Sequence, residues 1–346
     1  MNGEFLQALD QIAKEKGISK ELLIDAIDAA LVTAFKKNFG TSQNVKVTID
    51  RETGEVDVYA LKTVAEESEN DLLHISLQEA KALNKNYEIG DVVEMKVTPR
   101  NFGRIAAQTA KQVVVQRIRE AERGIIFDEY ISRENEIVTG LVQRKEKNSV
   151  FIDLGKTEAV LGPGEQTPNE EYNIGDRIKT FIVEVKKTTK GPQIVLSRTH
   201  PGLVKRLFEL EVPEIQSGIV EIKSIAREAG SRTKLAVYSH DENIDPVGAC
   251  VGQRGQRVQV IVDELRGEKI DIIEWNPDPV IFVGSALSPA KALAVEVNQE
   301  MNAARVVVAD SQLSLAIGKE GQNARLAAKL TGWKIDIKSQ SQVSGS

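Results

Sequence analysis

The sequence has little cysteine, few aromatic residues and no long hydrophobic run. Cys250 is the one cysteine among 346 residues, which excludes an internal disulfide framework and fits a reducing compartment. Apolar stretches such as residues 29–34 are broken by charge or polarity well before the roughly 18 residues that a membrane span needs. Glu4 and Asp10 stand where a secretory signal would be basic. We therefore expect a cytoplasmic protein with no membrane segment.

The sequence also lacks the excess of positive charge that is usual for a protein that binds nucleic acid through a diffuse field. It has 45 lysines and arginines against 51 acidic residues, a net charge of −6. Basic and acidic residues number 18 and 23 in residues 1–134, 10 and 9 in 135–200, and 17 and 19 in 201–346. If the protein binds RNA, local geometry has to provide the contacts.

Patterns for catalysis or metal binding are missing as well. His74, His200 and His240 are far apart in sequence and none is near the cysteine, so no zinc spacing occurs. Residues 155–157 (Gly-Lys-Thr) look like the end of a phosphate-binding P-loop, but Val150 stands where its first glycine is required. We therefore predict no catalytic residues, no metal and no cofactor, and we interpret the protein as a non-enzyme.

Residues 1–130 are predicted to form an N-terminal α/β domain. Apolar residues recur at helical spacing between Leu22 and Phe35, and Ser19 is positioned to cap that helix. Alternating patterns then predict a hairpin of two strands, a further strand and a second helix. These elements cover residues 45–49, 56–59, 91–97 and 103–123.

Four cations of this domain are candidates for contact with RNA phosphates or with an acidic partner: Lys36, Lys37, Arg104 and Lys111. Arg104 and Lys111 lie on the second helix, away from its apolar side, and Lys36 and Lys37 follow the apolar run of the first. Two structural interpretations stay open beside this one. Arg104 and Lys111 could belong to a solvated helix face, and Lys36 and Lys37 could complement a helix C-terminus.

Residues 131–200 are predicted to form a five-stranded OB-type barrel. The expected strands, separated by glycine-rich turns, cover residues 137–143, 150–154, 159–161, 177–186 and 193–197. Three segments resemble the RNA-binding OB domain named after the first protein of the small ribosomal subunit. They are Phe151-Ile152-Asp153-Leu154-Gly155, Gly175-Asp176-Arg177-Ile178 and Leu196-Ser197-Arg198.

Such barrels bind single strands by stacking bases on aromatic side chains. Phe151 and Phe181 are the candidates on the expected binding face. A core position is the alternative for each of them, and we favour it for Phe181. Four lysines could supply electrostatic contact instead: Lys145, Lys186, Lys187 and Lys190.

The last part of the chain contains an internal repeat. Residues 251–256 (Val-Gly-Gln-Arg-Gly-Gln) recur 66 residues later as residues 317–322 (Ile-Gly-Lys-Glu-Gly-Gln). A helical run and a Lys-Ile-Asp-Ile strand follow each copy, so the repeat indicates a duplicated domain. The junction over residues 275–279 contains two prolines and is stiff, and we expect the two copies to pack together.

Each copy contains a Gly-x-x-Gly loop between two expected helices, which suits contact with a sugar-phosphate chain. Glycine lets the backbone turn tightly and approach a phosphate without a Cβ, and the next helix offers free N–H groups. With a helix and two strands before the loop and one strand after it, each copy resembles the prokaryotic (type II) K-homology (KH) family. The resemblance implies a groove for about four unpaired nucleotides.

The resemblance also implies which residues bind RNA. They are Gly252, Gln253, Arg254, Gly255 and Arg257 in the first copy, and Gly318, Lys319, Glu320, Gly321 and Arg325 in the second. Arg254 supplies the cation expected in the loop, whereas Glu320 stands at that position in the second copy. Because a carboxylate repels phosphate, we expect the second loop to bind phosphate less firmly than the first.

An N-terminal domain followed by a barrel and two KH modules resembles the NusA family of bacterial transcription elongation, termination and antitermination factors. Three further segments carry the resemblance: residues 103–111, 197–202 and 324–329. It implies that the N-terminal domain docks on RNA polymerase near the RNA exit channel, while the other modules hold the emerging transcript. The implied partners are RNA polymerase, single-stranded nascent RNA and other transcription elongation factors.

We therefore predict an α+β multidomain protein that ends in two tandem type II KH domains. The expected domains are residues 1–130, 131–200, 201–276 and 277–346. The predicted function is that of a monomeric RNA-binding transcription factor. A ribosome-associated or general single-stranded RNA-binding protein is the main alternative. A phosphorolytic RNA-degrading enzyme also joins KH and OB modules, but it places them after large catalytic domains for which this chain has no room.

Overall fold

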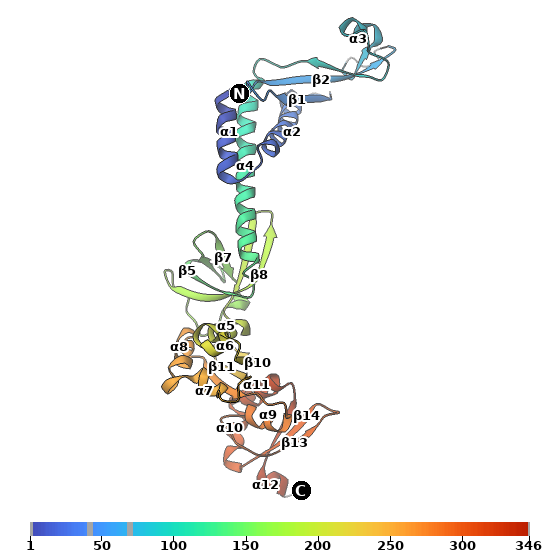
Figure 1. Ribbon diagram of the computed structural model, residues 1–346. Helices are drawn as coiled ribbons and strands as arrows, with labels where there is room; N and C mark the ends of the chain where they lie inside the picture. The colour runs from blue at the N-terminus through green and yellow to red at the C-terminus, as the bar shows by residue number, and fades with distance from the viewer. Residues whose placement is uncertain (1–2, 40–43, 68–71, 345–346) are drawn as a thin grey trace. The chain divides into compact units, whose positions relative to one another are not determined.

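A computed structural model describes residues 3–39, 44–67 and 72–344 of the chain (Figure 1). The chain divides into two compact units, which end and begin at Ile125 and Ile126. Helix α4 (Phe102–Ile131) contributes to both, since the division falls inside it. Each unit contains helices and sheets, in agreement with the predicted α+β class, and each is described by itself.

The first unit combines packed helices with a mixed sheet. Its elements before α4 are α1 (Gly3–Lys16), α2 (Lys20–Phe39), β1 (Val45–Ile49), β2 (Val56–Ala65), β3 (His74–Ser76), α3 (Leu77–Leu83) and β4 (Val92–Lys96). Strand β2 pairs antiparallel with β1 and β4 and parallel with β3. The predicted helices and strands occur as α2, β1, β2, β4 and α4, whereas α1, β3 and α3 are not among the predicted elements.

Two hydrophobic cores stabilise this unit. The larger one joins α1, α2 and α4 to β1 and the start of β2, with Leu9, Ile27 and Phe102 at its centre. The smaller one lies among β2, β3, α3 and β4 and consists of Val64, Ile75, Ala80 and Val93. Burial of each such side chain contributes about 1.5–3 kcal/mol to the free energy of unfolding. The apolar side of the long helix α4 therefore holds it against α1 and α2.

The second unit begins with a closed barrel of five strands. They are β5 (Ile137–Glu146), β6 (Ser149–Asp153), β7 (Glu158–Leu161), β8 (Arg177–Thr188) and β9 (Gly191–Ser197), in the order β5-β6-β7-β9-β8. This confirms the predicted OB-type barrel. Gly140 allows β5 and β6 to approach, because a Cβ there would lie 2.3 Å from Cγ2 of Ile152. Phe127 and Tyr130, on the last turns of α4, pack against the barrel core.

Two modules of the same topology follow. The first contains α5 (Pro201–Glu211), α6 (Pro213–Gln216), β10 (Val220–Glu228), β11 (Arg232–Ser239), α7 (Pro246–Val251), α8 (Gln256–Glu264) and β12 (Lys269–Glu274). The second contains α9 (Pro279–Ala286), β13 (Ala292–Asn298), β14 (Ala303–Val308), α10 (Leu313–Ile317), α11 (Gln322–Thr331), β15 (Lys334–Ser339) and α12 (Gln340–Ser344). In each sheet the first two strands are antiparallel and the third is parallel to the second. This is the arrangement that the repeat predicts.

The two modules share one hydrophobic core. Ala226, Ala236 and Ile273 on the sheet of the first module pack in one cluster with residues of α9 and α11 in the second, such as Phe282 and Ala327. The sheet of the first module is therefore covered by helices of the second. This confirms the prediction that the two copies pack together across the proline-containing junction.

Candidate nucleic-acid interface

The first Gly-x-x-Gly loop, residues 252–255, joins α7 to α8 through three left-handed backbone positions. Gly252, Arg254 and Gly255 have φ values of 74°, 52° and 77°. A Cβ on Gly252 would lie 2.7 Å from Cγ of Arg257, whereas one on Gly255 would meet nothing within 4 Å. Gly252 is thus required by packing inside the fold. Gly255 faces open space, where a sugar-phosphate chain can approach the backbone.

The second loop, residues 318–321, repeats this backbone between α10 and α11. Gly318, Glu320 and Gly321 have φ values of 78°, 52° and 74°. A Cβ on Gly318 would lie 2.8 Å from Asn323, and one on Gly321 would meet nothing within 4 Å. The two loops therefore have the same shape, and they differ in the side chains that they present.

The first loop offers unpaired polar side chains beside a groove. The side chains of Gln253 and Arg254 make no hydrogen bond or ion pair with any residue that the structure describes. The groove has a volume of about 560 Å³ and is lined by Glu214, Gly248, Ala249, Gly252, Gln253, Gln256 and Arg257. Helix α8 begins directly after the loop, so its positive dipole end points to the same place. A phosphate at the loop would meet both a free guanidinium and a helix N-terminus.

Arg257 forms part of the groove wall. Its Nη1 donates hydrogen bonds to Oε2 of Glu214 at 2.9 Å and to the backbone oxygen of Ala249 at 2.7 Å. The guanidinium therefore ties α8 to α6 and α7, and its charge is already matched by a carboxylate. Glu214 lies 43 residues before Arg257, and no local pattern in the sequence indicates this pairing.

The second loop has one unpaired cation and a carboxylate. Lys319 makes no side-chain hydrogen bond or ion pair within the described part of the chain, and Glu320 stands beside it. Arg325 is bound elsewhere, because its Nε donates to Oε1 of Glu228 in the first module at 2.6 Å. The net positive charge available to a phosphate is therefore smaller here than at the first loop, in line with the predicted asymmetry.

The barrel presents one partly exposed aromatic ring, that of Phe151, and it is covered on one side. The guanidinium carbon of Arg144 lies 3.7 Å from the centre of that ring, and Arg144 in turn pairs with Glu158 and Glu146. Phe181 is buried and stacks on His200 with the ring centres 4.6 Å apart. The interpretation of Phe181 as a core residue is therefore confirmed, and Phe151 stays the candidate for base stacking.

The four predicted cations of the first unit lie on exposed helix surfaces. Phe102 packs on Phe35 and Phe39, so the end of α2, with Lys36 and Lys37, lies beside the start of α4. Arg104 stands in the first turn of α4. Lys111 lies two turns further on, in a shallow groove of about 490 Å³ lined by Gln108, Lys111, Gln112, Val115, Gln116 and Arg119. The structure thus places Lys36, Lys37 and Arg104 near one another, where α2 ends and α4 begins.

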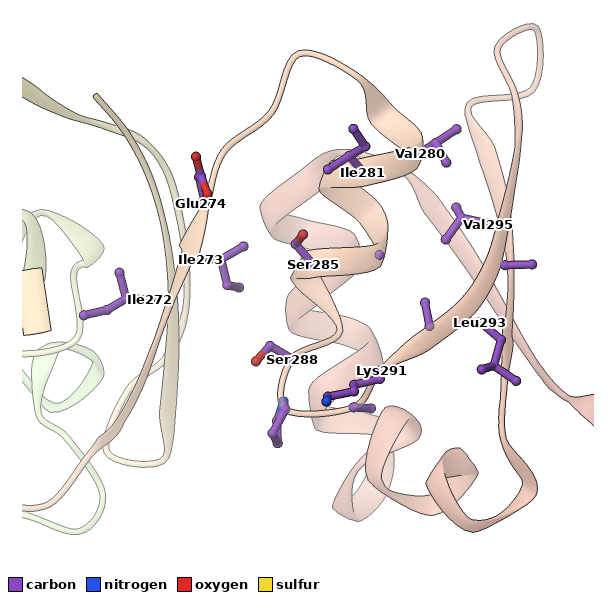
Figure 2. A pocket seen from close by; sticks show the side chains of 15 residues that line it. Ile272, Ile273, Glu274, Val280, Ile281, Ser285, Ser288, Lys291, Leu293 and Val295 are labelled. Carbon is purple, nitrogen blue, oxygen red and sulfur yellow. The ribbon is translucent and has the colours of Figure 1, made fainter. Parts of the chain in front are cut away.

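A larger groove, of about 700 Å³, lies between β12 of the first module and α9 and β13 of the second. Figure 2 shows Ile273 pointing toward α9, whereas Ile272 points to the other side of β12. The groove is mainly aliphatic, and Lys291 and Glu274 are its charged residues. With a single cation and no aromatic ring in its lining, it does not have the features of a binding site for a nucleic-acid strand.

Residues 3–39, 44–67 and 72–344 offer neither a metal cluster nor a membrane-spanning helix. Within these ranges no group of three or more His, Cys, Asp or Glu residues is arranged to hold a metal ion. No helix among them is long and apolar enough to cross a membrane. Cys250 is buried in α7, and this burial raises the pKa of its thiol to about 12. The features that remain for function are the two loops, the barrel face and the cations of the first unit.

Comparisons with known proteins define a multidomain RNA-binding protein. Family models match the NusA N-terminal domain over residues 4–124, the S1 RNA binding domain over 132–197, the NusA-like first KH domain over 198–275 and the NusA-like second KH domain over 279–344. The chain belongs to the NusA family of transcription termination/antitermination proteins, since the relatives below also match over nearly their whole length.

Two curated relatives carry the name transcription termination/antitermination protein NusA. The one from Halalkalibacterium halodurans is 62% identical over 99% of this chain and 90% of its own length. The one from Bacillus subtilis is 61% identical over 98% of this chain and 92% of its own length. A solution structure of the N-terminal domain of NusA from B. subtilis is 57% identical, with a TM-score of 0.33, and covers 36% of this chain and 99% of that domain.

Proposed function

We propose that this chain docks on bacterial RNA polymerase through its first unit, holds the emerging transcript with its second, and modulates pausing, termination and antitermination. Family membership supports the role in termination and antitermination. The observation that carries RNA capture is the pair of Gly-x-x-Gly loops on two modules that share a core. The side chains of Gln253, Arg254 and Lys319 have no partner among the described residues. Holding the transcript changes the populations of paused and active polymerase without chemistry by the protein itself.

The residues that we assign to RNA are those of the two loops. Gly252, Gln253, Arg254 and Gly255 form the stronger site, and Gly318, Lys319, Glu320 and Gly321 the weaker one. Arg257 and Arg325 act by fixing the helices that follow the loops, in accord with their ion pairs. Lys36, Lys37, Arg104 and Lys111 face the polymerase or guide RNA. Their exposure on α2 and α4, with Lys36, Lys37 and Arg104 near one end of these helices, supports this last assignment.

Four domains, residues 1–130, 131–200, 201–276 and 277–346, are the working division for this function. We propose that the protein is a monomer in the cytoplasm, that it works with other elongation factors and that it is not an enzyme. The curated names of its relatives, which describe transcription proteins, support the non-enzymatic role.

The test is the lifetime of a hairpin-stabilised pause by bacterial RNA polymerase, with and without this protein. We expect a longer pause that disappears when residues 1–125 are deleted. The deletion ends at residue 125 because Phe127 and Tyr130 pack against the barrel core and should stay with it. The truncated chain, which keeps both loops, is the matched control for RNA binding.

An unchanged pause together with intact RNA binding would contradict the polymerase part of the proposal. The ribosome-associated or general RNA-binding alternative would then be favoured, and co-sedimentation with ribosomes would separate its two forms. A pause that lengthens equally with the truncated chain would show that the first unit is not the anchor.

A further inference from the structure

The turn between β10 and β11, residues 228–231, makes one contact inside the first KH module, one with the barrel segment and one with the second KH module. Its Gly230 donates from the backbone nitrogen to Oε2 of Glu268 in the first KH module at 2.7 Å. The backbone oxygen of Gly230 accepts from Nδ2 of Asn169 in the barrel segment at 3.1 Å. A Cβ on Gly230 would lie 2.4 Å from Cγ2 of Thr167, so glycine is required by this close approach.

The third contact of the turn is with the second module and is made by Glu228. Its Oε1 accepts from Nε of Arg325 at 2.6 Å, and its Oε2 accepts from Nε2 of Gln322 at 2.8 Å. Gln322 also donates to Oγ of Ser231 at 2.7 Å. Both partners of Glu228 lie in the first turns of α11, directly after the second Gly-x-x-Gly loop.

The contact continues into the loop itself. Nη1 of Arg325 donates to the backbone oxygen of Glu320 at 3.1 Å. A chain of polar contacts therefore runs from Glu228 in the first module, through the guanidinium of Arg325, to the carbonyl of a left-handed loop residue. The hydrogen bond from Arg325 lowers the pKa of Glu228, with a further contribution from Gln322, so this carboxylate is ionised at neutral pH.

Among the described residues, no side chain of another module binds the first turns of the helix that follows the first loop. The residues that correspond to Gln322 and Arg325 in the repeat are Gln256 and Gln259. The side chain of Gln256 has no partner among the described residues, and Gln259 donates to Asp263 within its own helix. Among the described residues, a cross-module contact in the first turns of the helix is made after the second loop and not after the first, so the repeat does not explain it.

We propose that Glu228 is a positioning residue for RNA binding by the second KH module: it holds Gln322 and Arg325 and thereby fixes the second loop relative to the first. The inference rests on the proposed function, which requires that both loops contact RNA. Two binding sites at a fixed separation raise the effective concentration of the second site once the first is occupied. Losing the contact loosens this geometry and leaves the intrinsic affinity of each loop unchanged.

The experiment compares RNA of two lengths. An oligoadenylate of about 5 nucleotides occupies one module, whereas one of about 15 nucleotides reaches both. Glu228→Ala and Arg325→Ala are each expected to lower the affinity of the full chain for the long RNA about tenfold, which is part of the gain of roughly 100-fold or more that linked sites can give. Affinity for the short RNA should change less than twofold. The double variant should lose no more affinity for the long RNA than either single variant, because both substitutions remove the same contact.

Controls separate positioning from loss of folding. Glu221→Ala removes an exposed carboxylate at the other end of β10, which pairs with Lys223, and should leave both affinities unchanged. The charge-reversed pair Glu228→Arg with Arg325→Glu should recover part of the affinity for the long RNA. Trp275 and Trp333 lie in the two modules, and native fluorescence from both shows that a variant is folded.

Two results would overturn the inference. If Arg325→Ala weakened the short RNA as much as the long one, Arg325 would contact phosphate directly. If the unaltered chain bound the long RNA no more tightly than the short one, there would be no linked binding for Glu228 to support. Binding of the short RNA would in that case leave the proposed RNA capture standing, so the two failures are distinguishable.

Discussion

Arg198 donates two parallel hydrogen bonds to Glu170, from Nε to Oε2 at 2.9 Å and from Nη2 to Oε1 at 2.5 Å. Both side chains are almost fully buried, with 2% and 5% of their surface exposed. The same guanidinium donates to the backbone oxygen of Glu264, at the end of α8 in the first module. Arg198 therefore joins the barrel to the first KH module, which gives a physical role to the segment 197–202 that carries part of the family resemblance.

Replacing Arg198 by alanine is expected to lower the stability of the second unit strongly. Glu170 would remain buried without its cationic partner, and the loss of one member of a buried ion pair costs about 3–5 kcal/mol. Urea unfolding followed by the fluorescence of Trp275 and Trp333 measures the effect. The control is Lys186→Ala, which removes an exposed pair with Glu184 and should cost less than about 1 kcal/mol. Equal losses of stability in the two variants would contradict a structural role for the contact between the barrel and the first KH module.

Replacing Gln253 and Arg254 together by aspartate should reduce affinity for single-stranded RNA much more than the same change at Lys319 and Glu320. The first change removes the unpaired guanidinium of the stronger loop, and a hydrogen bond to a charged group contributes about 1.5–3 kcal/mol, or roughly 10- to 100-fold in affinity. The second loop already carries a carboxylate. Fluorescence anisotropy with one labelled RNA at constant salt measures both variants, and equal losses would refute the asymmetry.

The affinity for single-stranded RNA should depend only weakly on salt. Each phosphate contact contributes a slope of about −0.7 in a plot of log affinity against log salt concentration. The net charge of −6 and the two small loops allow only a few such contacts. Titrations between low and physiological salt measure the slope. A slope as steep as roughly −6 would mean that many more cations contact the RNA than the loops provide.

The elements that sequence alone predicts are those with a local signal. The five barrel strands follow from alternation and glycine turns, and the two loops follow from a repeat whose glycines occupy left-handed backbone positions. Helix α1 also has a regular apolar spacing, in Leu6, Leu9 and Ala13, but it buries only these three positions and its pattern is correspondingly weak.

The contacts that position the site have no local signal. Arg198 reaches Glu264 across 66 residues, and Arg325 reaches Glu228 across 97. A sequence pattern identifies Arg325 as a basic residue near a Gly-x-x-Gly loop, and it cannot show that a carboxylate of another module binds this guanidinium. Contacts within and between the modules decide which of these cations stay unpaired, so the predicted list of loop residues is broader than the set with unpaired side chains.

Cys250 should be unreactive toward iodoacetamide at pH 8 in the folded protein. Burial, with a smaller contribution from Glu214, raises the pKa of its thiol to about 12, and the thiolate is the reactive form. Mass spectrometry after a timed exposure should show no modification of the native chain and complete modification in urea. Rapid labelling of the folded protein would show that α7 opens and that the thiol of Cys250 is reactive.

Asp28, on α2, is expected to weaken the first unit above about pH 6. Its Oδ1 is buried and has no hydrogen-bond partner in the described part of the chain. Burial and the nearby charge of Asp25 raise its pKa to about 6, while Arg51 acts in the opposite direction. A carboxyl group whose pKa is higher in the folded state favours folding when it is protonated. Stability from this group is therefore greatest below its unfolded pKa of 3.8 and is lost as the pH rises through about 6.

Asp28→Asn should consequently stabilise α2 at pH 8. Because solvent screens this partly exposed group, the expected gain is on the order of 1 kcal/mol. The substitution should have little effect near pH 4. Hydrogen exchange of the amides of α2 in the full chain measures the change locally. Asp10→Asn is the matched control, because ion pairing with Lys14 lowers the pKa of Asp10, and its replacement should give no gain at pH 8. A carbon-13 titration of the Asp28 carboxyl group tests the cause directly. A midpoint near 4 would show that its charge is accommodated, and any gain from Asp28→Asn would then have another origin.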